Sequence, residues 1–233
     1  MNEQANGDGN RLFFDEHEWK TVEAAMARII PTDHQPGARE AGTVGFVDRY
    51  LSGIEYVYAK PDGSGFEKLT GKRAEAWQQR IDMLRETYAE GIEEMDRRSR
   101  ESFGDDFRQL SAEQQDRVLT DMEASAPADD ETLEEDQATA GFAPTEEAEP
   151  SEPAMQQTLT EVELDFFLLL VLHARQGFYS DPIYGGNKNR VGWEVLGFPG
   201  PESLAEVHSG RYSVLPYFAE SDANRGEEDN SGR

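Results

Sequence analysis

The chain contains no cysteine. This absence excludes disulfide bonds, thiolate metal sites, iron–sulfur clusters and haem attached through a CxxCH motif. Long apolar runs are also missing: the longest covers only residues 166–172, whereas a membrane-spanning helix needs about 20 residues. The N-terminus, MNEQANGDGNRLFF, has no basic start followed by an apolar stretch, so we expect no secretory signal of its own.

Basic residues are scarce. The 233 residues include 22 Lys and Arg against 48 Asp and Glu, giving a net charge of −26, and only five of the basic residues are lysines. Such a charge argues against binding to nucleic acid or to an anionic membrane surface, because both need clustered Lys and Arg. The composition is typical of a salt-loving organism, in which screening relieves self-repulsion. High genomic GC content combined with an acidic insert is the alternative explanation.

The acidic residues are concentrated in the second half of the chain. No Lys or Arg occurs from residue 118 to residue 174, and fifteen carboxylates lie between residues 121 and 165. Residues 124–157 are mainly Ala, Pro, Asp and Glu, with too few aliphatic residues to offset the entropy of ordering. We therefore predict a disordered acidic insert; an acidic docking segment for a basic partner is the alternative.

This insert divides one helical domain into two parts. We predict a flexible N-terminus at 1–11, a first helical part at 12–123, the insert at 124–157, a second helical part with a Gly/aromatic loop at 158–215, and a flexible tail at 216–233.

Apolar spacing predicts helices in both parts. In the first part they cover residues 15–30, about 41–51 and 71–90, with a continuation over 92–100, and a further helix follows Ser111. Asp15 with Glu18, and Ser111 with Gln114, have the spacing of capping boxes. A turn at 61–63 allows a short hairpin over 54–69, and residues 203–207 allow one helical turn.

The most apolar helix is expected in the second part. It would begin at a capping box formed by Thr160 and Glu163 and end at Gly177. Its residues 166–172 are apolar around the whole circumference, which is typical of a helix covered by neighbours on every side. No convincing strand pattern or internal repeat is present. We therefore predict an all-α fold in which five or six helices pack round this central helix and the acidic insert loops out.

Few residues suggest catalysis. The four histidines show no HExxH spacing, and neither a G-x-S-x-G elbow nor a phosphate loop is present. His17 is expected on an exposed face, and His173 near the C-terminal dipole of the central helix. The adjacent pair Asp33 and His34 is the one candidate for a metal or proton-transfer site. From the residues alone, an autonomous metal-dependent enzyme that uses this pair is one possible function, and an acidic interaction scaffold is another.

Two stretches carry a more specific pattern. Residues 29–42 read IIPTDHQPGAREAG, and residues 177–200 read GFYSDPIYGGNKNRVGWEVLGFPG. Together, and in this order, they resemble the gluconate 2-dehydrogenase subunit 3 family of small helical subunits. The resemblance covers roughly residues 12–123 and 158–200.

The resemblance implies a non-catalytic accessory subunit. In such complexes the FAD and the sugar or polyol chemistry belong to a large dehydrogenase subunit of the glucose–methanol–choline type, and a cytochrome c subunit often accepts the electrons. This chain would hold no cofactor itself and would help its flavoprotein partner to mature, or to be exported. Many members carry a twin-arginine signal, which is missing here. The expected location is therefore cytoplasmic, or periplasmic and membrane-associated through the partner.

The two motifs also supply the candidate partner-binding residues. Gly and Asn tolerate tight turns, Pro stiffens loops, and Tyr and Trp dominate interface energetics. We expect Trp193 and Phe198 to point inward and the turn 184–187 to be displayed. For the first loop, capping of the preceding helix is the favoured role and partner contact the alternative. The candidates are Pro31, Asp33, Pro36, Gly37, Ala38, Tyr184, Gly185, Gly186, Asn187 and Trp193.

Overall fold

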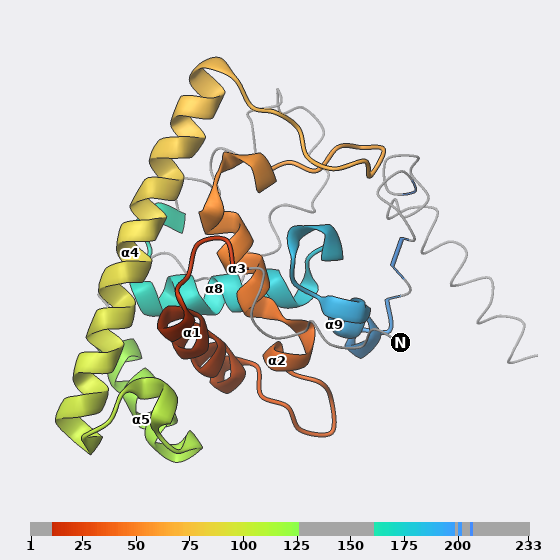
Figure 1. Cartoon of the computed structure of the whole chain (residues 1–233). Coiled ribbons are helices and arrows are strands. Elements are labelled where there is room, and N and C mark those ends of the chain that lie inside the picture. The colour runs from red at the N-terminus through yellow and green to blue at the C-terminus, as the bar shows by residue number, and fades with distance from the viewer. Residues whose placement is uncertain (1–10, 126–160, 199, 202–205, 207–233) are drawn as a thin grey trace, which may run out of the picture.

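The computed structural model describes residues 11–125, 161–198, 200, 201 and 206. Within these residues the chain forms helices and no β-strand, so the predicted all-α class is confirmed (Figure 1). The α-helices are α1 (Glu16–Ile29), α2 (Ala38–Ala41), α3 (Thr43–Ser52), α4 (Gly71–Phe103), α5 (Ala112–Glu123), α8 (Phe166–Tyr179) and α9 (Val191–Val195). Short 3-10 turns are η1 (Ile54–Tyr56), η2 (Phe107–Gln109), η3 (Pro182–Tyr184) and η4 (Lys188–Arg190).

Several predicted segments lie outside the described residues. They are the N-terminus up to residue 10, the acidic insert from residue 126, the cap at Thr160, nearly all of the turn at 203–207, and the tail. In the part of the chain that the structure describes, no helix is long and apolar enough to cross a membrane.

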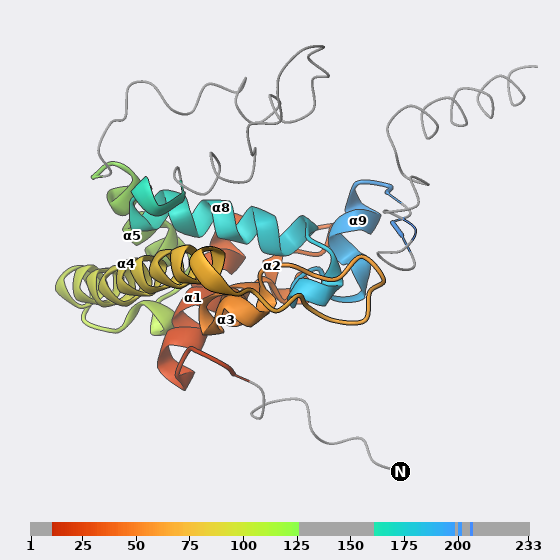
Figure 2. The ribbon, with the colours of Figure 1, turned by 90° about the horizontal axis from the view of Figure 1, so that it is seen from above.

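Helix α8 lies at the centre of the fold, as predicted. It contacts α1, α2, α3, α4, α5 and α9. Figure 2 shows it running across the other helices, from α5 at one end to α9 at the other. Leu169 and Leu170 are fully buried, whereas Leu168 and Leu172 on its outer side are only half-buried. The neighbours of α8 therefore cover most of its circumference, but not all of it.

The ends of α8 differ from the prediction. Its N-cap is Asp165, whose carboxylate accepts hydrogen bonds from Phe167 N at 2.7 Å and Leu168 N at 3.2 Å. Residues 161–163 form a separate helical turn before it. Gly177 does not end the helix, which continues to Tyr179. A Cβ at this glycine would lie 3.0 Å from Thr43 O and 3.1 Å from Phe46 Cβ, so glycine lets α8 approach α3 closely.

The capping boxes of α1 and α5 are confirmed. In α1, Asp15 Oδ1 accepts from Glu18 N at 2.8 Å and Glu18 Oε2 accepts from Asp15 N at 2.8 Å. In α5, Ser111 Oγ accepts from Gln114 N at 3.4 Å and Gln114 Oε1 accepts from Ser111 N at 2.9 Å. Each pair satisfies two backbone groups that the first turn of a helix leaves without partners.

The predicted helix at 41–51 is divided in two. Gly42 adopts a left-handed conformation with φ 63°, which ends the short α2 and starts α3. By contrast, the two segments predicted at 71–90 and 92–100 form one continuous helix, α4, of 33 residues. At 1.5 Å per residue α4 is about 50 Å long and runs along one edge of the molecule (Figure 1).

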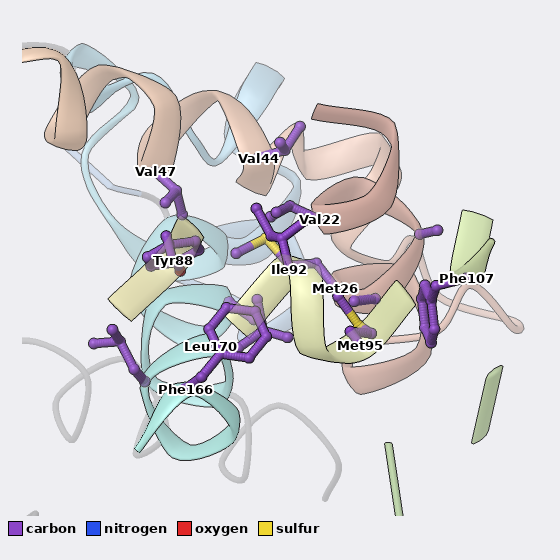
Figure 3. Close-up of a cluster of buried hydrophobic side chains, with 14 of the residues drawn as sticks. Val22, Met26, Val44, Val47, Tyr88, Ile92, Met95, Phe107, Phe166 and Leu170 are labelled. Carbon is purple, nitrogen blue, oxygen red and sulfur yellow. The ribbon is translucent and has the colours of Figure 1, made fainter. Parts of the chain in front are cut away.

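Both parts of the chain share one hydrophobic core. Figure 3 shows side chains from α1, α3, α4 and α8 meeting there. Tyr88, Phe107, Leu169 and Leu170 are each 0% exposed. Because α8 supplies the middle of this core, the helices before the insert cannot bury their apolar faces without the part of the chain that follows it.

A buried carboxylate ties the N-terminal segment to this core. Asp48 on α3 is 2% exposed and accepts three backbone hydrogen bonds: from Leu12 N at 2.7 Å, Phe13 N at 3.0 Å and Phe14 N at 2.8 Å. This arrangement satisfies the buried charge and fixes where the chain enters α1.

Candidate partner-binding site

The first candidate loop connects α1 to α2. A hydrogen bond from Ala38 N to Ile30 O, 2.8 Å long, closes this loop. Residues 31–35 within the loop are exposed. Glu40 Oε2 accepts from Thr32 Oγ1 at 2.6 Å and from Gly37 N at 2.9 Å, and these hydrogen bonds lower the pKa of Glu40. A Cβ at Gly37 would lie 2.5 Å from Ile30 O, so only glycine fits the closed loop.

The predicted members of this loop have different exposure. Pro31 and Asp33 are exposed, Pro36 is half-buried, and Gly37 and Ala38 are buried. The exposed residues can touch a partner directly. The buried ones can act only by holding the loop in shape.

The Asp33–His34 pair forms at this exposed tip. His34 Nδ1 lies 3.2 Å from Asp33 Oδ2, and the side chains are 82% and 59% exposed, respectively. Asp33 Oδ1 also accepts from Gln35 N at 2.8 Å. Among the described residues, no group of three or more His, Cys, Asp or Glu side chains is arranged to hold a metal ion. The pair therefore lacks a third ligand within that part of the chain.

The second motif is organised by Asn187, which is 0% exposed. Its backbone N donates to Gly177 O at 2.8 Å and its Nδ2 donates to Ser180 O at 2.9 Å. Its Oδ1 accepts from Gly192 N at 2.8 Å. Asn187 thus joins the end of α8 to the start of α9 through three hydrogen bonds.

The two glycines before Asn187 pack directly against helix backbones. A Cβ at Gly186 would lie 2.1 Å from Gly177 O, and one at Gly185 would lie 2.8 Å from Gly45 O. Gly186 and Asn187 are buried, so the expectation that the whole turn 184–187 is displayed was wrong. The turn contacts the backbones of α3 and α8 so closely that no side chain fits at either glycine. Within the turn, only Tyr184 and Gly185 are partly exposed.

Trp193 points inward, as expected. It is 6% exposed, and its Nε1 donates to Tyr179 O at 2.8 Å. Phe198 packs edge-on against its indole with ring centroids 5.4 Å apart, and Phe198 N donates to Trp193 O at 2.8 Å. Trp193 therefore anchors α9 on the end of α8 and is not itself available at the surface.

The two motifs meet around α2. The first loop leads directly into α2, and both η4 and α9 of the second motif contact the same helix. A Cβ at Gly42 would lie 3.4 Å from Lys188 Cδ, so the lysine side chain covers the end of α2. Segments separated by about 150 residues thus form one surface region, which we call the paired-motif region: residues 31–42 and 181–196.

A separate cluster of buried polar groups joins α4 to α8 and to Glu161, which precedes α8. His173 is fully buried in the middle of α8, so its expected place at the C-terminal dipole was wrong. Its Nδ1 lies 2.9 Å from Tyr88 Oη, and its Nε2 hydrogen-bonds the Glu161 carboxylate, which also pairs with Arg80. Burial, with Arg80 nearby, lowers the pKa of His173 to about 3. The imidazole is therefore neutral, with Tyr88 donating to Nδ1 and Nε2 donating to Glu161.

His17 also has protein partners, contrary to the expectation of a solvated side chain. Its Nε2 lies 2.5 Å from Asp96 Oδ2, and Arg108 Nε donates to its Nδ1 at 3.1 Å. Asp96 in turn accepts from Phe107 N at 2.9 Å. This histidine links α1 to α4 and η2.

Sequence reasoning missed one neighbour of the paired-motif region. Tyr184 packs edge-on against Phe66 with ring centroids 5.7 Å apart, and its hydroxyl accepts from Ala59 N at 3.2 Å. The alternating aromatics Tyr56 and Tyr58, within the hairpin allowed at 54–69, were the available signal.

Comparison with protein families gives one relevant match. The family model described as gluconate 2-dehydrogenase subunit 3 matches residues 16–200, which include all the helices named above and both motifs. Searches of curated proteins and of solved structures return no match. The match spans well over half of the 233 residues, and the chain therefore belongs to the gluconate 2-dehydrogenase subunit 3 family.

Proposed function

We propose that this chain is the small accessory subunit of an FAD-dependent dehydrogenase of the gluconate type. In this role it binds the large flavoprotein subunit and supports its maturation or stability, while the FAD and the substrate chemistry belong to that partner. A cytochrome c subunit is a further candidate component of the complex. The observation that carries the proposal is the family match over residues 16–200.

The geometry of the paired-motif region supports such a role. The exposed residues Pro31 and Asp33 lie on a loop that Gly37 and Glu40 hold in one conformation. The buried side chains of Asn187 and Trp193 hold the second motif against the end of α8 through hydrogen bonds to Ser180 O and Tyr179 O. Preformed loops lose little entropy on binding, which favours a stable complex. In this proposal the exposed residues contact the flavoprotein and the buried ones keep the surface rigid.

The test is expression of the flavoprotein subunit from the same genome, with and without this chain. We expect the large subunit alone to be insoluble or poor in flavin, and co-expression to raise both its soluble yield and its ratio of bound flavin to protein. Recovery of a fully flavin-loaded, active large subunit in the absence of this chain would contradict the proposal.

The competing proposal, a metal-dependent enzyme using Asp33 and His34, makes a different prediction. It requires stoichiometric metal in the isolated chain and loss of activity in His34→Ala. Metal analysis of the purified chain separates the two functions, because the accessory role requires no metal at this pair.

A further inference from the structure

A second surface adjoins Tyr184. After η1, the chain folds back on itself at residues 58–67 and reaches outward from the end of α4 (Figure 1). Lys60 N donates to Gly65 O at 2.7 Å, Glu67 N donates to Tyr58 O at 2.7 Å, and Ala59 and Phe66 form an isolated antiparallel bridge. The turn sequence Pro61-Asp62-Gly63 thus produces a short two-armed projection that carries aromatic side chains.

Five half-buried aromatic residues form two contact groups on this projection and its supports. Ring centroids are 5.3 Å apart for Tyr56 and Phe66, and 5.6 Å apart for Tyr58 and Trp77; Tyr184 joins through Phe66. We call this set the aromatic surface: Tyr56, Tyr58, Phe66, Trp77 and Tyr184. All five lie outside the hydrophobic core cluster and keep part of their area exposed.

Arginine side chains accompany these rings. The Arg73 guanidinium lies 4.3 Å from the centre of the Tyr58 ring, and the Arg49 guanidinium lies 5.6 Å from that of Tyr56. Tyr, Trp and Arg are the residues most enriched at the energetic centres of protein interfaces. Rigid rings held by one another and by guanidinium groups lose little side-chain entropy when a partner covers them.

The local charge balance distinguishes this surface from the rest of the molecule. Over residues 54–77 four cations offset four exposed carboxylates (Glu55, Asp62, Glu67 and Glu75), so this stretch has no net charge. Only five lysines occur in a chain of net charge −26, and three of them, Lys60, Lys68 and Lys72, lie beside the aromatic surface and are exposed. With Arg73 they place cationic groups around its edge. In so acidic a protein, a locally neutral surface lowers the repulsion of an acidic partner, and its exposed lysines can pair with carboxylates of that partner.

We propose that the aromatic surface docks an acidic segment of the large flavoprotein subunit, with the rings covered by apolar side chains of the partner and Lys60, Lys68 and Lys72 paired with its carboxylates. This inference rests on the proposed function and specifies where, and by what chemistry, the partner is held. Because Tyr184 belongs to both, the aromatic surface extends the paired-motif region along one side of the molecule.

The experiment measures the affinity of the purified chain for the flavoprotein subunit from the same genome. Tyr58→Ala is expected to weaken binding at least about tenfold, the usual loss at an aromatic interface centre. The double variant Lys60→Glu/Lys72→Glu is expected to weaken it about three- to tenfold at low salt, and this loss should shrink at high salt because screening weakens exposed charge pairs. Circular dichroism and thermal melting check that each variant is folded.

A matched control carries the same charge change elsewhere. Lys20→Glu/Arg117→Glu alters α1 and α5, far along the chain from the aromatic surface, and should leave the affinity within about twofold. Unchanged binding by Tyr58→Ala and the lysine variant, or an equal loss in the control, would overturn the inference while leaving the proposed function intact.

Failure of the unaltered chain to bind would instead refute the proposed function. Self-association of the chain that the same substitutions abolish would assign the surface to a second copy and also overturn the inference.

Discussion

At the scale of single residues, the buried polar side chains determine how this chain responds to its environment. His173 is neutral because burial lowers its pKa to about 3, while Tyr88 and Glu161 satisfy both ring nitrogens. In the unfolded chain the same imidazole titrates near 6.5. Between these values the unfolded state binds up to one more proton than the folded state, so acid favours unfolding.

The first prediction concerns this histidine. Its contribution to stability is complete above pH 6.5 and declines as the pH falls towards the folded value of about 3, with a slope of about 1.4 kcal/mol per pH unit. Gln can keep both hydrogen bonds without titrating. The free energy of unfolding of His173→Gln, measured by urea titration between about pH 6.5 and pH 5, should therefore fall less steeply than that of the unaltered chain.

The same measurement on His34→Gln supplies the control, since that side chain is 82% exposed. Its slope should match that of the unaltered protein. An identical slope in His173→Gln would show that the buried imidazole does not govern this part of the pH response.

The second prediction concerns Asp48, which accepts backbone hydrogen bonds from three consecutive residues. In Asp48→Asn the charge is lost, and the amide NH₂ group cannot accept a hydrogen bond. Because hydrogen bonds to charged groups contribute about 1.5–3 kcal/mol each, we expect a loss of at least about 3 kcal/mol in unfolding free energy. Hydrogen exchange at residues 12–14 should also accelerate. Asp105→Asn, at an exposed position, should change neither quantity.

At the scale of elements, glycines set the distances between helices. Gly91 lies in the middle of α4, where helix propensity alone favours alanine by about 1 kcal/mol. However, a Cβ at this position would lie 2.0 Å from the Phe166 ring, which packs directly on the helix backbone. The close contact between α4 and α8 therefore requires glycine at a position where helix propensity favours alanine.

This conflict gives the third prediction. Gly91→Ala should destabilise the protein by about 2–3 kcal/mol, because overpacking of the core outweighs the gain in propensity. A double-mutant cycle with Phe166→Ala isolates the cause: in that background the ring is absent, and Gly91→Ala should be neutral or stabilising. Equal destabilisation in both backgrounds would rule out the ring as the obstacle.

The same elements show which features local sequence can specify. The capping boxes at Asp15 and Ser111 were predictable because both partners lie within one helical turn. Gly177 resembled a helix stop but is an interior residue, because its role depends on Thr43 and Phe46 of α3, far away in sequence. Gly186 and Asn187 were likewise expected at the surface, since turn residues usually lie there, yet contact with Gly177 buries them.

At the scale of the whole molecule, two parts of the chain build one core on either side of the acidic region. Helices α1, α3, α4 and α5 come from the first part, and α8 from the second supplies the centre that they cover. The central position of α8 was predictable from its composition. The buried contacts of Arg80 with Glu161 and of Tyr88 with His173 were not, since they join residues about 80 positions apart in the sequence.

The last prediction follows from this shared core. If the chain is divided between residues 140 and 141, neither fragment can bury its apolar surface alone, because Leu169 and Leu170 are fully buried only within the assembled core. Co-expressed fragments should therefore co-elute as a one-to-one complex with the helical circular dichroism of the intact chain. Leu170→Asp in the second fragment should abolish the complex, since it buries an unpaired charge, whereas Arg175→Asp at an exposed position of the same helix should preserve it. Separate elution of two folded fragments would show that the two parts are independent domains and that the first fragment folds without α8.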